Sequence, residues 1–387
     1  MEKIEEIRQR ILNQISISQD ISDEEIYDRI DEELFLAFPS GSITARNRLE
    51  YRKDLFHSIR GLDLLQGLLD DEEITEIMVN GKDHIFVEKK GQLFETDKHF
   101  ASEARLDNVI QKIVGRVNRR VNESKPIVDA RLLDGSRVNI VLAPIALEGS
   151  AITIRKFPKE VITMDQLIQW GSISKEAAEF LKDLVVKKYN IFISGGTGAG
   201  KTTFLNALTD YIPKDERLIT IEDSAELQIR GIKNLVRLEC REANSEGENA
   251  ITMRNLVVNA LRMRPSRLII GEVRSGEAFD LIAGALNTGH SGSISTGHAN
   301  SAKDMLKRLE TMMLMAVDIP IYAIRSQIAS AVDILIHLGR MPDKTRKLLA
   351  IEEVCDIKDG EIQTNPLFRY EKGGLKKVGE LQKKKDC

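Results

Sequence analysis

A glycine-rich segment is the clearest sign of chemistry in this sequence. Residues 195–202 read GGTGAGKT, a complete GxxxxGK[ST] pattern between a predicted buried strand at 190–194 and a predicted helix. Glycines let backbone N–H groups turn towards a phosphate, and the start of a helix adds a favourable dipole. Lys201 would neutralise the β- and γ-phosphates, and the Thr202 hydroxyl would hold Mg²⁺. A glycine-rich turn that matches by chance would need neither the strand nor the helix.

The pattern therefore predicts a nucleotide site that takes ATP and Mg²⁺. The residues expected to contact the nucleotide here are Gly195, Gly196, Thr197, Gly198, Ala199, Gly200, Lys201, Thr202 and Thr203.

Acidic residues follow two later predicted strands. The strand at 218–221 runs into Glu222 and Asp223, and the strand at 267–271 runs into Glu272. In an open α/β sheet the carboxyl ends of the strands face the ligand crevice, so these acids would point at the γ-phosphate and its metal. Glu272 fits a role in polarising the attacking water or in holding the Mg²⁺ shell, and Glu222 is a second candidate for activating water. Acids that only cap a helix or close a turn are the alternative.

Two histidines lie in the segment 288–300. A predicted strand at 292–296 would place His298 at its carboxyl end, near the same crevice, and His290 before its other end. We expect His298 to sense the γ-phosphate and His290 to act in structure or at a subunit boundary. Histidines that only pack or close a turn are the alternative. Zinc is disfavoured because no third ligand lies nearby.

Arginines form the third group of candidates. Arg131, Arg137 and Arg155 lie on three predicted strands of the middle of the chain. Hydrolysis of a γ-phosphate benefits from a cation that enters as charge develops, often from another domain or subunit. As a group these three are candidate catalytic residues that couple domain position to the nucleotide state. Most arginines of a soluble protein serve only its solubility, which is the alternative for any one of them.

The predicted secondary structure around these residues changes along the chain. Helical spacing dominates at first, with a capping-box pattern at Ser22 to Glu25. Strand and helix periods are mixed in the middle, and helices then alternate with strands as in a mostly parallel α/β sheet with helices on both faces. The lysine-rich end, 376–387, is expected to be a solvated tail. The predicted division is a helical appendage at 1–60, an α+β domain at 62–157, a linker at 158–173 and an α/β domain at 174–387.

Composition limits the class of protein. The chain has 387 residues, and 56 Lys and Arg against 60 Asp and Glu give a formal net charge of −4. This balance argues against a dedicated binder of duplex nucleic acid. No apolar run approaches the length of about 18 residues that a membrane span needs. The acidic, amphipathic start shows no secretory signal. The cysteines Cys240, Cys355 and Cys387 lie far apart, which indicates reduced thiols of a cytosolic protein and excludes a cysteine-based zinc module.

The motifs, taken in order, resemble a known superfamily. The order GGTGAGKTT, LITIEDSAEL, RNLVVNALRMRPSRLIIGEVR and NTGHSGSISTGHANS is similar to that of the type II/type IV secretion ATPases. The segments DARLLDGSRVNIVLAP and ITIRKF look like the CpaF branch, which serves tight-adherence (Flp) pilus assembly. The resemblance covers roughly residues 62–354. Two features differ from the type II secretion ATPases. This chain has no tetracysteine metal module, and its helical segment at 1–60 is shorter than their N-terminal docking region.

The resemblance implies a hexameric ring in which an N-terminal domain is hinged to a RecA-like ATPase domain. It also implies a role for each matching residue: Lys201 and Thr202 in the Walker A motif, Glu222 and Asp223 in the Asp box, Glu272 in the Walker B motif, His290 and His298 in the His box, and Arg131, Arg137 and Arg155 close to the nucleotide.

The sequence thus predicts an ATP-hydrolysing ring motor. We expect it to be cytoplasmic, peripheral to the inner face of the cell membrane, and to engage an inner-membrane platform protein of a pilus or secretion machine. One rival is a nucleic-acid motor of the same superfamily, which is disfavoured because aromatic residues for base stacking make up only 5% of the chain. The other rival is a nucleotide-binding switch with little hydrolysis, against which Glu222 and Glu272 both argue.

Overall fold

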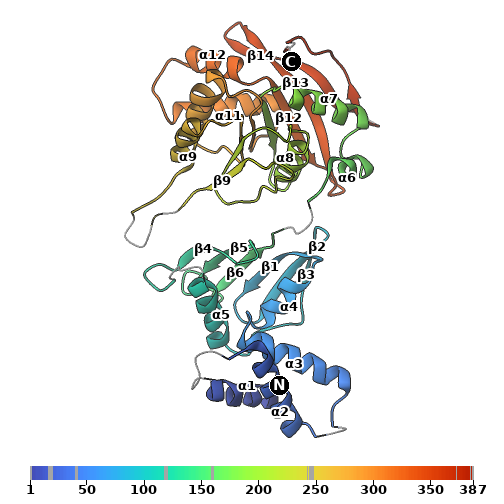
Figure 1. The fold of residues 1–387 in the computed structure, drawn as a ribbon, viewed down its shortest axis with the longest axis vertical. Helices are drawn as coiled ribbons and strands as arrows, with labels where there is room; N and C mark the ends of the chain where they lie inside the picture. Colours follow the sequence, from blue (N-terminus) through green and yellow to red (C-terminus); the bar gives the residue numbers. More distant parts are fainter. Residues whose placement is uncertain are drawn as a thin grey trace. The chain divides into compact units, whose positions relative to one another are not determined.

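The chain forms two compact units, Met1–Lys159 and Glu160–Cys387, each described here by itself (Figure 1). The computed structural model describes residues 2–15, 21–39, 42–116, 121–157, 161–241, 243, 248–371, 373–383 and 385. Cys387 and the first residues of the predicted linker, 158–160, lie outside the described residues.

Three helices open the first unit, as the sequence predicts. They are α1 (Glu2–Ile15), α2 (Asp23–Ala37) and α3 (Ala45–Ile59). The capping box is present, because the Glu25 N–H donates to Ser22 Oγ at 3.2 Å and the Ser22 N–H donates to Glu25 Oε2 at 2.9 Å. The apolar stripes of the three helices meet in a small core of their own, formed by Ile7, Ile11, Ile26, Ile30, Leu34 and Leu55.

A six-stranded antiparallel sheet completes this unit, in the order β3-β2-β1-β6-β5-β4. Alternate residues such as Ile77, Val79 and Ile154 bury one face against α4 and α5. Strands and helices are mixed in this region, as the sequence predicts for the middle of the chain. The elements are α4 (Leu64–Asp70), β1 (Ile74–Asn80), β2 (His84–Lys89), β3 (Gln92–Glu95), α5 (Glu103–Arg116), β4 (Ile127–Arg131), β5 (Arg137–Val141) and β6 (Ala151–Arg155).

The second unit is built on a nine-stranded sheet in the order β15-β14-β13-β12-β7-β11-β10-β8-β9. The six strands from β12 to β9 are parallel, and β13, β14 and β15 extend the sheet antiparallel from β12. The strands are β7 (Ile191–Gly195), β8 (Leu218–Glu222), β9 (Leu235–Glu239), β10 (Arg267–Ile270), β11 (Ile294–Gly297), β12 (Ile334–Arg340), β13 (Arg346–Lys358), β14 (Glu361–Glu371) and β15 (Gly374–Lys377).

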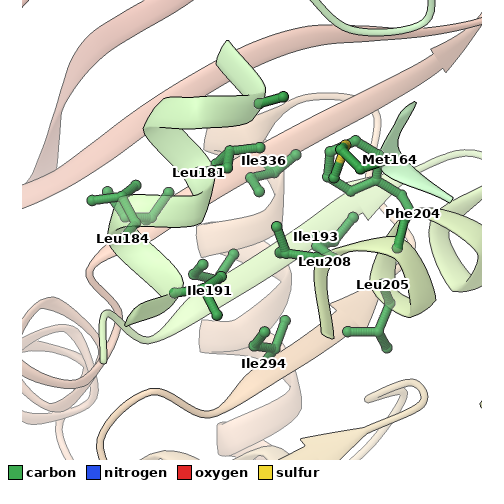
Figure 2. Packing of buried hydrophobic residues seen from close by; sticks show 14 of the residues in the cluster. Met164, Leu181, Leu184, Ile191, Ile193, Phe204, Leu205, Leu208, Ile294 and Ile336 are labelled. Carbon is green, nitrogen blue, oxygen red and sulfur yellow. The ribbon is translucent and has the colours of Figure 1, made fainter. Parts of the chain in front are cut away.

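Helices cover both faces of this sheet, which confirms the predicted α/β architecture with a large sheet. Successive residues of a strand point to opposite faces, so Ile191 and Ile193 join one core and Phe192 joins the other. Figure 2 shows the first core, in which α7 and α8 pack on β7. The helices are α6 (Met164–Gln169), α7 (Lys175–Val186), α8 (Lys201–Thr209), α9 (Met253–Ala260), α10 (Glu277–Phe279), α11 (Ala302–Leu314) and α12 (Ile321–Ala331).

Two predictions at the edges of this unit are wrong. Most of the predicted linker, 158–173, belongs to the core, because α6 forms within it and buries Met164 and Leu167. The predicted tail begins within the sheet, since β15 includes Lys376 and Lys377, although the side chains of both lysines are exposed. Beyond that strand the backbone N–H of Lys383 donates to the buried carboxylate of Glu353 at 2.6 Å. The predicted linker folds into the core because its apolar side chains recur at helical spacing. The end of the chain is held because a buried carboxylate needs hydrogen-bond donors.

None of the helices among the described residues is long and apolar enough to cross a membrane.

Candidate nucleotide-binding site

The GGTGAGKT segment forms a tight loop from the carboxyl end of β7 to the start of α8. Gly198 and Gly200 have φ angles of 70° and 89°, a region that favours glycine. A Cβ on Gly195 would lie only 2.6 Å from the carbonyl oxygen of Leu338 on β12. The first helical bond of α8 runs from the Phe204 N–H to the Gly200 carbonyl at 2.9 Å. The loop therefore presents the N-terminal end of α8, where backbone N–H groups favour an anion.

Lys201 is folded back over this loop and is only 8% exposed. Its Nζ donates to the carbonyls of Gly195 and Gly196, each at 3.2 Å. The same Nζ lies 3.4 Å from both ring nitrogens of His298, which follows β11. The structure thus brings the lysine of the predicted Walker A motif and the second histidine together.

Glu272 lies next in this line of contacts, at the end of β10. Its Oε1 is 3.1 Å from Nε2 of His298, and its Oε2 accepts a 3.0 Å hydrogen bond from Arg274. Arg274 also donates to Asp223 at 3.3 Å. Five charged or titratable side chains from three strand ends and the loop therefore form one chain of contacts: Lys201, His298, Glu272, Arg274 and Asp223.

His298 is held neutral by its surroundings. Burial lowers its pKa, and the positive charges of Lys201, Arg274 and Arg308 lower it further, whereas Glu272 opposes them. A neutral imidazole offers one donor and one acceptor.

Glu222 has a different position from the one expected of a water-activating group. It is buried, and its Oε2 accepts the backbone N–H groups of Glu226 and Leu227 at 2.6 and 2.8 Å. Burial raises the pKa of this carboxyl, although the two N–H bonds oppose the shift. In this structure its carboxylate holds the turn after β8, while Asp223 beside it is exposed.

Oxygen donors that suit Mg²⁺ lie at the start of α8. The Thr202 hydroxyl is 3.4 Å from Oε2 of Glu226, a residue that the sequence analysis did not assign to the site. These oxygens, together with those of Glu272, fit a Mg²⁺ ion whose ligands come mainly from a nucleotide and in part from the protein. Among the described residues there is no group of three or more metal-binding side chains that could hold a metal alone.

His290 is not brought to the phosphate loop. It precedes β11, which runs parallel to β7, so it lies at the amino edge of the sheet while the loop leaves the carboxyl edge. Its Nδ1 is 3.3 Å from the carbonyl of Ala285. Within one chain His290 closes a turn, and a contact to nucleotide from this position stays a prediction about a neighbouring subunit.

The three predicted arginines of the first unit form a row across neighbouring strands. Arg137 is the direct partner of Arg131 on β4 and of Arg155 on β6. Arg155 lies 3.9 Å from Glu76, its own partner on β1. Like charges opposite each other weaken a strand pair. Arg131 also donates from Nε to the carbonyl of Gly135 at 3.0 Å. A contact of these arginines to nucleotide stays a prediction.

A pocket of about 620 Å³ opens beside the phosphate loop. Its lining joins the loop to the contact chain and to α11, and includes Gly196, Thr197, Arg274, His298, Lys307 and Arg308. The sequence analysis did not single out Arg274 or Arg308. Arg274 ends the motif that carries Glu272, two residues after it, whereas only the fold relates Arg308 to the site.

The fold and this site belong to a defined class of protein. Residues 60–374 match the family described as "Type II/IV secretion system protein", and the chain belongs to this family.

Curated relatives match most of the chain. A putative conjugal transfer protein of Mycobacterium tuberculosis (strain CDC 1551 / Oshkosh) is 34% identical over 321 residues, which cover 81% of this chain and 90% of the relative. The type IV secretion system protein VirB11 of Brucella suis biovar 1 is 33% identical over 304 residues, covering 72% and 84%.

Solved structures share the fold. The pilus retraction motor PilT with bound ADP has a TM-score of 0.56 at 21% identity, covering 76% of this chain and 83% of that one. The Legionella pneumophila ATPase DotB has a TM-score of 0.54 at 20% identity, covering 76% and 80%.

Proposed function

We propose that this chain is a Mg²⁺-dependent ATPase of the type II/IV secretion superfamily. The observation that carries this proposal is the contact chain from Lys201 through His298 to Glu272 at the carboxyl edge of the sheet. The residues of the phosphate loop, Gly195 to Thr203, would hold the nucleotide phosphates. A magnesium ion bound with ATP would supply charge neutralisation, with Thr202 and Glu272 as its nearest protein oxygens.

Each member of the contact chain then has a distinct task. Lys201 neutralises the β- and γ-phosphates. Glu272 accepts a proton from the attacking water or orients it. His298 lies between the two and reports whether a γ-phosphate is present, because its neutral ring can donate to one neighbour and accept from the other. Asp223 and Arg274 hold Glu272 in place, and Glu222 supports the turn that carries Asp223.

The finer proposal concerns the assembly. We infer a homohexameric ring of the CpaF-like branch, in which a RecA-like domain bears the phosphate loop and powers pilus assembly or protein secretion. The ring would be cytoplasmic and peripheral to the inner face of the cell membrane, and would act on a platform protein there. Arg131, Arg137 and Arg155 would supply cations to the nucleotide as charge develops, and His290 would lie at a subunit boundary. The order of the sequence motifs and the membership of the family support this inference.

A second candidate is a nucleic-acid motor, which the names of several relatives as conjugal transfer proteins favour. Its test is the ATPase rate with single- and double-stranded DNA at low salt. A rate that DNA does not change would exclude it. A regulatory switch is excluded if Mg·ATP is turned over by the wild type above the rate of the Glu272→Gln variant.

The experiment that tests the proposed function is Mg·ATP turnover per subunit as a function of protein concentration, with Glu272→Gln as the blank. A site completed by a neighbouring subunit should show turnover that rises steeply with concentration and reaches a plateau as rings close. Turnover that is flat down to monomeric concentrations would contradict the trans role of the three arginines. Turnover equal to the blank at every concentration would contradict the ATPase itself. In cells, Lys201→Ala should abolish pilus assembly, and intact pili would contradict that role.

A further inference from the structure

Two arginines of the second unit lie beside the phosphate loop on a hairpin. β12 ends at Arg340 and β13 begins at Arg346, and the two are direct partners across this antiparallel pair. Two like charges in such a position destabilise a strand pair. Among the residues that the structure describes, neither guanidinium forms an ion pair with a carboxylate. The hairpin therefore carries two positive charges that its own neighbours do not neutralise.

Both side chains lie close to the glycines of the loop, and Arg346 forms a hydrogen bond with it. Nε of Arg346 donates a 2.9 Å hydrogen bond to the carbonyl of Gly198. A Cβ on Gly200 would lie 3.2 Å from Cδ of Arg346, and a Cβ on Gly198 would lie 3.8 Å from Nη1 of Arg340. The bond to Gly198 uses only Nε, so it does not involve the two Nη groups of Arg346.

The sheet order sets the direction of approach. β7, which leads into the loop, lies between β11 and β12. His298 follows β11, whereas Arg340 ends β12. The two arginines therefore reach the loop from the side opposite to His298 and Glu272, where the proposed γ-phosphate chemistry takes place.

We propose that Arg340 and Arg346 bind the α- and β-phosphates of the nucleotide from this second side. A guanidinium presents several N–H donors in one plane, which suits phosphate oxygens better than a lysine does. In this arrangement the backbone of the loop and Lys201 contact the phosphates directly. The two arginines of the hairpin add two positive charges on the β12 side of the loop. This inference deepens the proposed function and rests on it, since it needs a nucleotide in the loop.

The test is binding of ADP without turnover, measured by titration calorimetry on the full chain. Arg346→Gln keeps a donor for the Gly198 carbonyl and removes only the charge, so the loop should stay in place. We expect Arg346→Gln and Arg340→Ala each to weaken ADP binding about tenfold, as for the loss of one charge-assisted hydrogen bond. The salt dependence of ADP affinity should also become shallower, because fewer charges meet the phosphates.

A matched control is Arg369→Ala, an exposed arginine on β14 of the same sheet, paired with Ala350. It should leave ADP affinity unchanged. Inorganic pyrophosphate is the second probe, and its affinity should fall by the same factor as that of ADP. A loss for ADP alone would overturn the phosphate assignment in favour of the base. Unchanged ADP affinity and salt dependence in both variants would overturn the inference, whereas a wild-type chain that binds no ADP would overturn the proposed function itself.

Discussion

Nε2 of His298 lies 3.1 Å from Oε1 of Glu272, although the two residues follow different strands of the parallel sheet. Both nitrogens of the same imidazole are 3.4 Å from Nζ of Lys201. One ring therefore touches both the cation of the phosphate loop and the carboxylate proposed to activate water.

Replacing Glu272 with Gln should remove turnover and keep nucleotide binding. The amide retains the size of the side chain but cannot accept a proton, so we expect kcat to fall about 10²–10⁴-fold, the usual contribution of a general base. Steady-state ATPase assays and ADP titration measure the two effects. Glu371→Gln, an exposed residue of β14, is the matched control and should keep full turnover. A comparable rate in both variants would contradict the role of Glu272.

His298 should determine how kcat declines at acidic pH. Its pKa is lowered, mainly by burial, so it is neutral at pH 7 and gains a proton only below its ordinary value. The added charge beside Lys201 should reduce kcat as the pH falls below about 6.5. In His298→Gln, which does not titrate, this decline should disappear. A decline of the same midpoint in the variant would assign it to another group.

Glu222 should make stability depend on pH in the opposite sense to an ordinary carboxylate. Its folded pKa is raised by burial, so the folded state keeps a proton that the unfolded chain has already released. Stability from this group is present at low pH and is lost as the pH rises through the raised pKa. Glu222→Gln, which cannot ionise, should therefore gain stability relative to wild type as the pH rises above the ordinary glutamate pKa of about 4.3, as measured by urea unfolding. Parallel stability curves for the two proteins would contradict this.

The C-terminal segment should contribute to the stability of the second unit. Glu353 is fully buried and accepts N–H groups from Gln382 and Lys383, together with the amide of Asn365. A chain ending at Glu380 would leave this carboxylate with fewer donors and should lose about 1–3 kcal/mol of unfolding free energy. Denaturant unfolding measures the change. Lys376→Ala, on exposed β15, is the control and should change stability by less than about 0.5 kcal/mol.

Much of the fold could be predicted from local patterns. The capping box at Ser22, the paired strands around 74–89 and the strand–loop–helix at 190–202 depend on residues close in sequence, whose spacing the chain itself displays. The position of β12 beside β7, a strand about 140 residues earlier, could not be predicted, because it depends on pairing between distant segments.

Local patterns along the chain are enough to predict the nucleotide loop and the two strand-end acids, since a GxxxxGK[ST] motif and buried strands are local in origin. The partners of these residues depend on how distant segments pack together. Parallel strands bring their carboxyl ends to one edge, and this edge joins Lys201, His298 and Glu272 while it leaves His290 at the other. In the folded chain the carboxylate of Glu222 accepts hydrogen bonds from its own loop, and Arg340 and Arg346 lie beside Gly198. Such contacts depend on strand order, which no spacing along the chain encodes.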